Sequence, residues 1–197
     1  MLARHAGVCA ALTTAERDRA AVFRVDRDRH DFVAAHALVR VCAGLLLDRP
    51  AVDLTIVQRC AACGRGHGRP TLVEDRATAV SFAHTRGSVV AAAARRPVGV
   101  DVERLDRGAP DGATIRAAMS AAEVRAIGAA ADVRAAFLRL WVLKEALVKV
   151  GALELDGFRA VDLSTFLAAE GPAAWAGWWL SAWRHDGVMV GQALAAG

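Results

Sequence analysis

The chain has 197 residues, of which 55% are hydrophobic, and a formal net charge of +4 at pH 7. This hydrophobic content excludes a disordered chain, and the length fits one domain or two tightly joined halves. The modest positive charge suits phosphates or an acidic protein partner. Because no compact Lys/Arg run with a recognition motif occurs, we expect no nucleic-acid partner.

The amino-terminal sequence, MLARHAGVCAALTTAERDR, has no long apolar segment before charged residues resume, so we expect no signal peptide. The longest uncharged stretch runs from Gly171 to Trp183. It is shorter than the roughly 18 residues that are needed to span a bilayer. We therefore expect a soluble, cytoplasmic protein with no membrane partner.

Two helical patterns of bulky residues have the same spacing, at Phe32–Arg40 and at Phe137–Glu145. Each is followed by a VDL segment, at 52–54 and at 161–163, which is typical of a strand. The sequence therefore suggests a diverged internal repeat. Chance similarity in a chain rich in Ala and Val is the alternative.

The later part of each half is rich in strand-forming residues. His84 and His185 each stand at a turn that leads into such a run. Pro97 interrupts any continuous strand near the middle of the chain. We therefore predict an α+β protein with two similar halves, residues 1–97 and 98–197, packed as a pseudo-twofold dimer.

Four cysteines occur, and a cytosolic chain keeps them reduced. Cys60 and Cys63 form a CxxC, with His67 four residues further on. A zinc knuckle would need a fourth ligand, and no second CxxC or HxxxH follows. We therefore favour a glycine-rich loop with two reduced thiols, and a zinc-dependent nucleic-acid module is the alternative.

Residues suited to phosphate occur in two further places. His84 precedes a glycine-containing turn between two predicted strands, and a turn histidine without a ligand is the alternative. The segment 66–70, GHGRP, offers a flexible backbone and a cation beside a fixed proline.

The sequence Gly99-Val-Asp101-Val-Glu103 is the strongest local signal for chemistry. Side chains alternate along a strand, so Asp101 and Glu103 share one face while Val100 and Val102 face the core. Two carboxylates at a strand end suit Mg²⁺, which takes one or two protein carboxylates together with water and phosphate oxygens. A solvated edge strand with two surface acids is the alternative.

A long helix is predicted to begin near Arg134 and to include Trp141, Glu145 and Lys149. Trp141, Glu145 and Lys149 are spaced at i, i+4 and i+8, so they share one face of the helix. Glu145 and Lys149 would then look into a cleft. An ordinary solvated Glu–Lys pair is the alternative. A capping box, Ser120-Ala-Ala-Glu, predicts the start of another helix.

In this order and spacing, His84, the GVDVE at 99–103 and the WxxKExxxK at 141–149 resemble the 4′-phosphopantetheinyl transferases of the surfactin-synthetase-activating (Sfp) type. The upstream RCxxCGxxHGRP and FxxxxxLxR segments and the Ser120 helix start are similar too. The resemblance covers the chain from about Asp26 to its C-terminus. It implies two similar α+β halves with coenzyme A in the cleft between them.

The resemblance also implies a metal site and a reaction. Asp101, Glu103 and Glu145 would hold Mg²⁺, for which Mn²⁺ can substitute. The enzyme would move phosphopantetheine from coenzyme A, its co-substrate, to a serine of an apo acyl or peptidyl carrier protein, and release adenosine 3′,5′-bisphosphate. The catalytic residues implied are Glu145, which takes the serine proton directly or through water, Lys149 at the leaving phosphate, and Asp101.

Two departures from the family pattern concern the nucleotide. Asp31 stands where relatives carry an arginine, and it would repel a 3′-phosphate; His36 stands where a small residue is more usual. The coenzyme A contacts implied by the resemblance are Arg19, Arg27, Arg69, Pro70, His84, Thr85, Lys144 and Lys149.

The resemblance implies carrier domains of polyketide and nonribosomal peptide synthases as partners, with fatty-acid carriers as a further option. We expect a monomer, because two halves already supply the interface that a one-half relative would obtain by oligomerising. A protein of the same fold that binds coenzyme A or a carrier without catalysis is the alternative function.

Overall fold

The structure is a computed structural model that describes residues 7–59, 64, 66, 68–106, 108 and 110–197. It combines helices with two four-stranded sheets, ordered β1-β2-β3-β4 and β5-β8-β7-β6. The predicted α+β class is therefore confirmed. The chain divides into two compact units, unit 1 from Met1 to Val98 and unit 2 from Gly99 to Gly197. Cys60, Cys63 and His67, on which the zinc alternative depends, lie outside the described residues.

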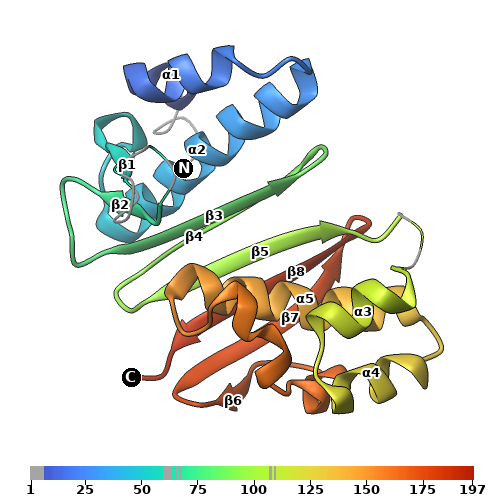
Figure 1. The fold of residues 1–197 in the computed structure, drawn as a ribbon. Helices are drawn as coiled ribbons and strands as arrows, with labels where there is room; N and C mark the ends of the chain where they lie inside the picture. The colour runs from blue at the N-terminus through green and yellow to red at the C-terminus, as the bar shows by residue number, and fades with distance from the viewer. Residues whose placement is uncertain (1–6, 60–63, 65, 67, 107, 109) are drawn as a thin grey trace. The chain divides into compact units, whose positions relative to one another are not determined.

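Unit 1 consists of a long helix laid against a sheet (Figure 1). Thr13 begins helix α1 (Thr14–Ala21) with a capping box that it shares with Glu16. Helix α2 (Asp26–Leu47) packs mainly against strands β3 and β4. The other elements are η2 (Val8–Ala11), η3 (Ala51–Asp53), β1 (Ile56–Gln58), β2 (Pro70–Leu72), β3 (Ala79–Thr85) and β4 (Ser88–Ala94).

Helix α2 is long and apolar enough to cross a membrane by length and composition, but half of it is buried within the protein. Val39 and Ala43, four residues apart on one face, join Leu72 and Val80 in an apolar cluster. The helix also buries three polar side chains, each with a hydrogen-bond partner in unit 1: Asp31, His36 and Arg40. In this structure α2 is the core helix of unit 1.

The carboxylate of Glu16 is buried between α1 and α2. It accepts hydrogen bonds from the Thr13 backbone N–H at 2.7 Å and from Nη2 of Arg40 at 2.7 Å, and Nδ1 of His36 lies 2.6 Å from its other oxygen. Burial by itself would raise the pKa of Glu16, but hydrogen bonds with His36, Arg40 and Thr13 outweigh it and lower this pKa to about 2. The folded state therefore favours the ionised form of Glu16.

We expect Glu16 to contribute to the acid sensitivity of the fold. Its folded pKa lies below the ordinary value of 4.5, so its stabilisation is present above about pH 4.5 and is lost as the pH falls towards 2. This loss amounts to about 3 kcal/mol at most. Urea unfolding of Glu16→Gln between about pH 6 and pH 3 should show a flatter pH dependence than the wild type. Asp18→Asn, exposed on the same helix, should keep the wild-type slope; a Glu16→Gln profile parallel to the wild type would contradict the assignment.

Unit 2 also combines a long helix with a four-stranded sheet (Figure 1). Helix α5 (Val133–Val150) packs mainly against β8, and also against β7. The other elements are β5 (Val98–Arg104), α3 (Gly112–Ala118), α4 (Ala121–Gly128), η4 (Leu155–Ala160), η5 (Ser164–Leu167), β6 (Ala173–Trp175), β7 (Trp178–His185) and β8 (Val188–Ala195). The pseudo-twofold packing of the two halves remains a prediction.

Two glycines let α5 approach the sheet backbone to backbone. A Cβ added to Gly99 on β5 would lie 2.1 Å from the carbonyl oxygen of Ala146. One added to Gly191 on β8 would lie 2.5 Å from the carbonyl oxygen of Val142. Since real Cβ atoms do not come this close to a backbone, the position of α5 depends on glycine at both points.

The two VDL segments are not strands, so that prediction is wrong. Asp53 closes the turn of η3 through a bond from its N–H to the carbonyl of Pro50. Asp162 accepts the N–H of Ser164 at 3.0 Å in the link between η4 and η5. The turn at Asp53 and the side chain of Asp162 here satisfy backbone groups in place of a strand ladder. The two predicted histidine turns are hairpin ends, between β3 and β4 and between β7 and β8.

Candidate active site

Strand β5 places Asp101 and Glu103 on one face, as the alternation of the sequence predicts. Val100 and Val102 on the other face are buried, at 4% and 2% exposure. Asp101 is also buried, at 8% exposure, whereas Glu103 is half-buried. Asp101 is therefore not the solvated surface acid of the alternative interpretation. A buried charge requires compensation by a nearby partner.

Helix α5 brings that compensation from Lys149. The helix begins at Asp132, whose side chain accepts the N–H of Ala135 at 2.9 Å, and it ends at Gly151 in the left-handed conformation. In the last turn of the helix, Nζ of Lys149 donates to Oδ1 of Asp101 at 2.9 Å and to the carbonyl of Val100 at 2.7 Å. The predicted face of α5 is thus turned towards β5.

Glu145 lies one turn before Lys149 and within electrostatic reach of both strand carboxylates. Its partly buried position raises its pKa, the charges of Asp101 and Glu103 raise it further, and Lys149 offsets part of the effect. Burial likewise raises the pKa of Asp101, against the opposing influence of Lys149. Three acids and one ammonium therefore form a coupled group, which we call the acidic cluster: Asp101, Glu103, Glu145 and Lys149.

The acidic cluster fits a hard divalent cation in its chemistry. Oδ2 of Asp101 is buried and has no hydrogen-bond partner, so one carboxylate oxygen is left for a ligand. Carboxylate oxygens are the donors that Mg²⁺ prefers. Within the described part of the chain, however, no three His, Cys, Asp or Glu side chains are already arranged to hold a metal. The carboxylates are near one another, and Lys149 occupies one oxygen of Asp101.

Lys144, predicted as a coenzyme A contact, is turned away from solvent, and that prediction is wrong for this structure. Its side chain is fully buried, and its ammonium donates to Glu123 at 2.6 Å and to the carbonyls of Phe158 and Val161 at 2.5 and 3.0 Å. The physical reason is helical geometry: Lys144 is about 100° around α5 from Glu145 and points into unit 2. An ammonium with three protein acceptors has no donor left for a phosphate.

The predicted phosphate-binding turn lies at the β3–β4 hairpin of unit 1. His84 is exposed near the end of β3, followed by half-buried Thr85, and Gly87 has a φ of 85°, which favours glycine. Asp31 on α2 accepts the backbone N–H of Gly87 at 2.7 Å. This buried carboxylate therefore holds the hairpin to α2, and its predicted repulsion of a nucleotide phosphate stays a prediction.

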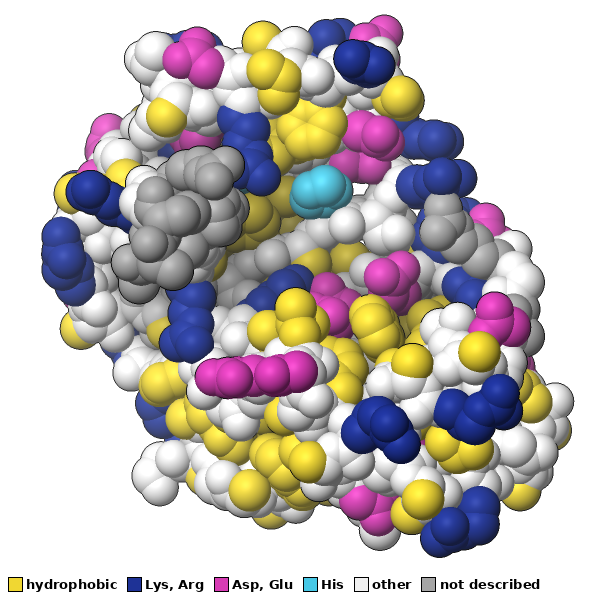
Figure 2. Space-filling model, viewed as in Figure 1, with side chains coloured by type: hydrophobic (Ala, Val, Ile, Leu, Met, Phe, Trp, Pro, Cys, Tyr) yellow, Lys and Arg dark blue, Asp and Glu magenta, His cyan; other side chains and the backbone are white. Residues whose placement is uncertain are grey.

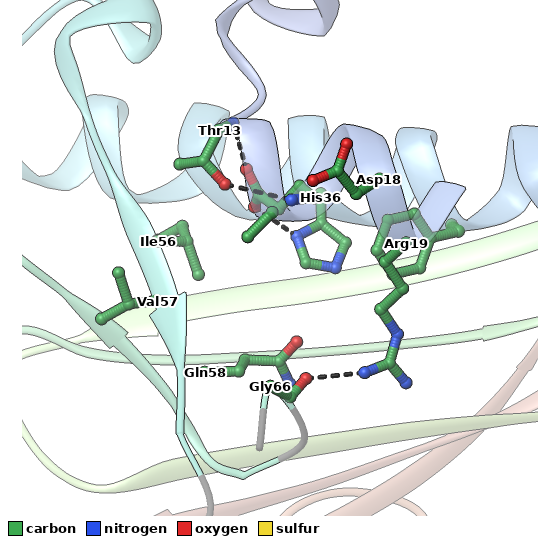
Figure 3. Close-up of a pocket in the computed structure, with 11 residues that line it drawn as sticks. Thr13, Asp18, Arg19, His36, Ile56, Val57, Gln58 and Gly66 are labelled. Atoms are coloured by element: carbon green, nitrogen blue, oxygen red, sulfur yellow. Dashed lines mark hydrogen bonds and ion pairs between the residues drawn. The ribbon is translucent and has the colours of Figure 1, made fainter. Parts of the chain in front are cut away.

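Unit 1 also contains a pocket of about 460 Å³ between α1, α2 and β1 (Figure 3). Arg19 points into it from α1 and donates to the carbonyl of Gly66 at 2.6 Å. His36 lines it from α2, and Nε2 of this buried ring has no hydrogen-bond partner. Gln58 reaches it from β1. Apolar walls with a few polar groups are typical of a pocket for a small molecule or cofactor.

The remaining predicted coenzyme A contacts are distributed over the surface of unit 1. Arg27 and Arg69 are exposed, on α2 and just before β2, and half-buried Pro70 pairs with Gln58 in the β1–β2 ladder. On the face shown in Figure 2, Lys and Arg side chains are scattered among acidic and apolar ones and form no continuous basic patch.

Sequence reasoning missed two features of these sites. Glu123 was recognised only as half of a capping box, although its carboxylate also binds Lys144 and the N–H of Leu163. His36 was noted only as unusual, although it lines a pocket. The sequence signal for the Glu123–Lys144 pair is Lys144 itself, which stands among leucines in an apolar helix. A lysine buried in such surroundings requires a partner.

Comparison with protein families agrees with the geometry of unit 2. Residues 97–186 match the model of the 4′-phosphopantetheinyl transferase superfamily. The matched segment contains the whole acidic cluster and the Glu123–Lys144 pair. No curated protein matches the chain.

Proposed function

We propose that the chain transfers the 4′-phosphopantetheine group of coenzyme A to a serine of an apo acyl or peptidyl carrier protein and releases adenosine 3′,5′-bisphosphate. The observation that carries the proposal is the acidic cluster: a buried Asp101 with one unpartnered oxygen, beside Lys149 and Glu145. This cluster lies within the segment that resembles the superfamily, so local chemistry and the family match support the same reaction.

The residues of the cluster suit this reaction. The serine hydroxyl attacks the β-phosphorus of coenzyme A, and the bond from that phosphorus to the bridging oxygen breaks. Glu145 accepts the hydroxyl proton, directly or through a water molecule. Lys149 stabilises or protonates the leaving phosphate. Mg²⁺ held by Asp101, Glu103 and Glu145 would neutralise and orient the pyrophosphate when bound.

The pocket of unit 1 supports a nucleotide contact for Arg19. It offers a guanidinium for a phosphate and, at His36 and Gln58, polar atoms for a planar base. We further propose that the surface residues Arg27, Arg69, Pro70, His84 and Thr85 contribute to coenzyme A binding, and that the enzyme acts as a cytoplasmic monomer on carrier domains of polyketide or nonribosomal peptide synthases.

Intact-protein mass spectrometry of carriers tests the function. The full chain is incubated with Mg²⁺, coenzyme A and apo carriers from polyketide, nonribosomal peptide and fatty-acid synthases. One added phosphopantetheine on at least one carrier is expected, and Asp101→Asn should abolish it. No mass gain on any carrier would contradict the proposal. Coenzyme A binding by calorimetry without mass gain would favour the non-catalytic alternative.

Removal of the Lys149 charge is expected to tighten divalent-metal binding. The ammonium is 2.9 Å from Oδ1 of Asp101 and opposes a second cation there. Titration calorimetry with Mg²⁺ should give Lys149→Met about tenfold higher affinity than the wild type, equivalent to ~1.4 kcal/mol. Lys149→Arg, which keeps the charge, should bind as the wild type does. Equal affinities for Lys149→Met and the wild type would show that Lys149 does not compete with the metal.

A further inference from the structure

A fully buried ion pair joins Glu123 at the start of α4 to Lys144 in α5, the residue that precedes Glu145 of the acidic cluster. Both side chains have an exposure of 0%, and the ammonium is 2.6 Å from Oε2 of Glu123. The other two donors of Lys144 go to the carbonyls of Phe158 and Val161. All three N–H groups of the ammonium are therefore satisfied, which is what burial of such a charge requires.

The carboxylate of Glu123 is equally occupied. Besides Lys144, it accepts the N–H of Ser120 at 2.7 Å and, through its other oxygen, the N–H of Leu163 at 2.9 Å. The pair thus connects three segments that are distant in sequence: the start of α4, the middle of α5, and the link from η4 to η5. A shift of α5 against either of the other segments would break a buried charged hydrogen bond.

Stability alone does not explain a buried pair of this kind. The cost of desolvating two charges offsets most of their attraction, so an apolar pair of the same shape often gives an equal or higher free energy of unfolding. An ion pair with directional hydrogen bonds restricts the relative positions of its two helices more than a contact between leucine or methionine side chains would. Its distinctive effect is therefore on the position and rotation of α5.

The rotation of α5 decides where Glu145 points. Lys144 and Glu145 are consecutive, so their side chains leave the helix about 100° apart. When Lys144 is fixed at three acceptors, the direction of Glu145 towards Asp101 and Glu103 is fixed as well. Trp141, one turn earlier on the Glu145 face, adds a contact between α5 and η4 because its ring packs edge-on against Phe158 at 5.4 Å.

We propose that Glu123 and Lys144 are positioning residues: their buried ion pair, anchored on Phe158, Val161 and Leu163, sets the rotation of α5 so that Glu145 meets Asp101 and Glu103. The inference rests on the proposed function only for its effect on turnover. Its effect on the assembly of the carboxylates holds for any ligand of the acidic cluster. Neither residue touches the substrate; both act through Glu145.

The test replaces the ion pair by a neutral pair of similar shape, Glu123→Gln with Lys144→Met, and measures three quantities. The free energy of unfolding is expected to stay close to the wild-type value, because no buried charge is left unpaired. Affinity for Mn²⁺, followed by electron paramagnetic resonance, is expected to fall about tenfold as the carboxylates lose their mutual placement. In the carrier assay, kcat should fall about 100-fold with little change in KM for coenzyme A.

The matched control is the buried pair of unit 1. Glu16→Gln with Arg40→Met neutralises a comparable ion pair remote in sequence from the acidic cluster, and its Mn²⁺ affinity should equal that of the wild type. If the Glu123/Lys144 double variant does not fold, Lys144→Arg keeps the buried charge and its pairing with Glu123 but changes the length and geometry of the cation, and should show the same losses in smaller degree.

The outcomes separate this inference from the proposed function. Wild-type Mn²⁺ affinity and kcat in a folded double variant, or in the folded single variant, would overturn the positioning role. Absence of carrier modification by the wild type would overturn the proposed function, while a loss of Mn²⁺ affinity in the double variant would still support positioning.

Discussion

Glu145→Gln is expected to lower kcat/KM for carrier modification by about 10³-fold, the size typical of a lost general base. Glutamine keeps the shape of the side chain but neither accepts the serine proton nor carries charge to a cation. In the metal-free protein, burial and the charges of Asp101 and Glu103 raise the pKa of Glu145. Intact-mass time courses with saturating and limiting coenzyme A would measure the loss.

The same substitution should leave the fold intact or slightly stabilise it. Glu145 is repelled by two neighbouring carboxylates, so neutralising it removes an unfavourable interaction. An inactive variant with an undiminished melting temperature therefore separates chemistry from structure. Glu154→Gln, an exposed acid beyond the end of α5, is the matched control and should retain full activity. Wild-type rates for Glu145→Gln would exclude Glu145 from the chemistry.

Gly99→Ala is expected to destabilise unit 2 by about 3 kcal/mol or more, the upper range for overpacking at a tight contact. The new Cβ would be 2.1 Å from the carbonyl oxygen of Ala146 and 3.1 Å from Cγ1 of Val150. The first of these atoms belongs to the backbone of α5, so the clash is not relieved by a rotamer change. The helix must move away from β5, and urea unfolding would report the cost.

Displacement of α5 should also disrupt the arrangement of the acidic cluster, because Gly99 is two residues from Asp101 and Ala146 follows Glu145. Reduced Mn²⁺ affinity is therefore expected even under conditions in which the variant remains folded. Gly128→Ala provides the control: this glycine ends α4 in helical conformation with no atom within 4 Å of an added Cβ. Alanine there should raise stability by about 0.5 to 1 kcal/mol. Equal stability of Gly99→Ala and the wild type would contradict the close approach of α5.

Periodicity accounts for the parts of the site that could be predicted. The alternation of Asp101 and Glu103 with two valines needs only a strand, and the spacing of Glu145 and Lys149 needs only a helix. The capping box at Ser120 is equally local, since its two bonds join residues three apart. Such patterns depend only on residues near in sequence, so they can be predicted before the fold is known.

Partners distant in sequence account for the failures. The apolar residues around Lys144 indicate that its ammonium needs a partner, but nothing near it shows that the partner is a carboxylate 21 residues away. Nothing near Asp31 shows that it binds a turn 56 residues away. The VDL segments failed for the opposite reason, because turns with nearby residues satisfied backbone groups that a strand ladder would have used.

The sequence by itself determined the α+β class, the strand that carries Asp101 and Glu103, and the helical face that carries Glu145 and Lys149. Only the tertiary structure decided that Lys149 rather than Lys144 meets Asp101, and that Lys144 is fixed by Glu123. Adjacent residues on a helix point in different directions, and which direction faces a carboxylate depends on how the helix packs. Sequence periodicity shows which side chains share a face of a helix, whereas tertiary packing decides which residues each face contacts.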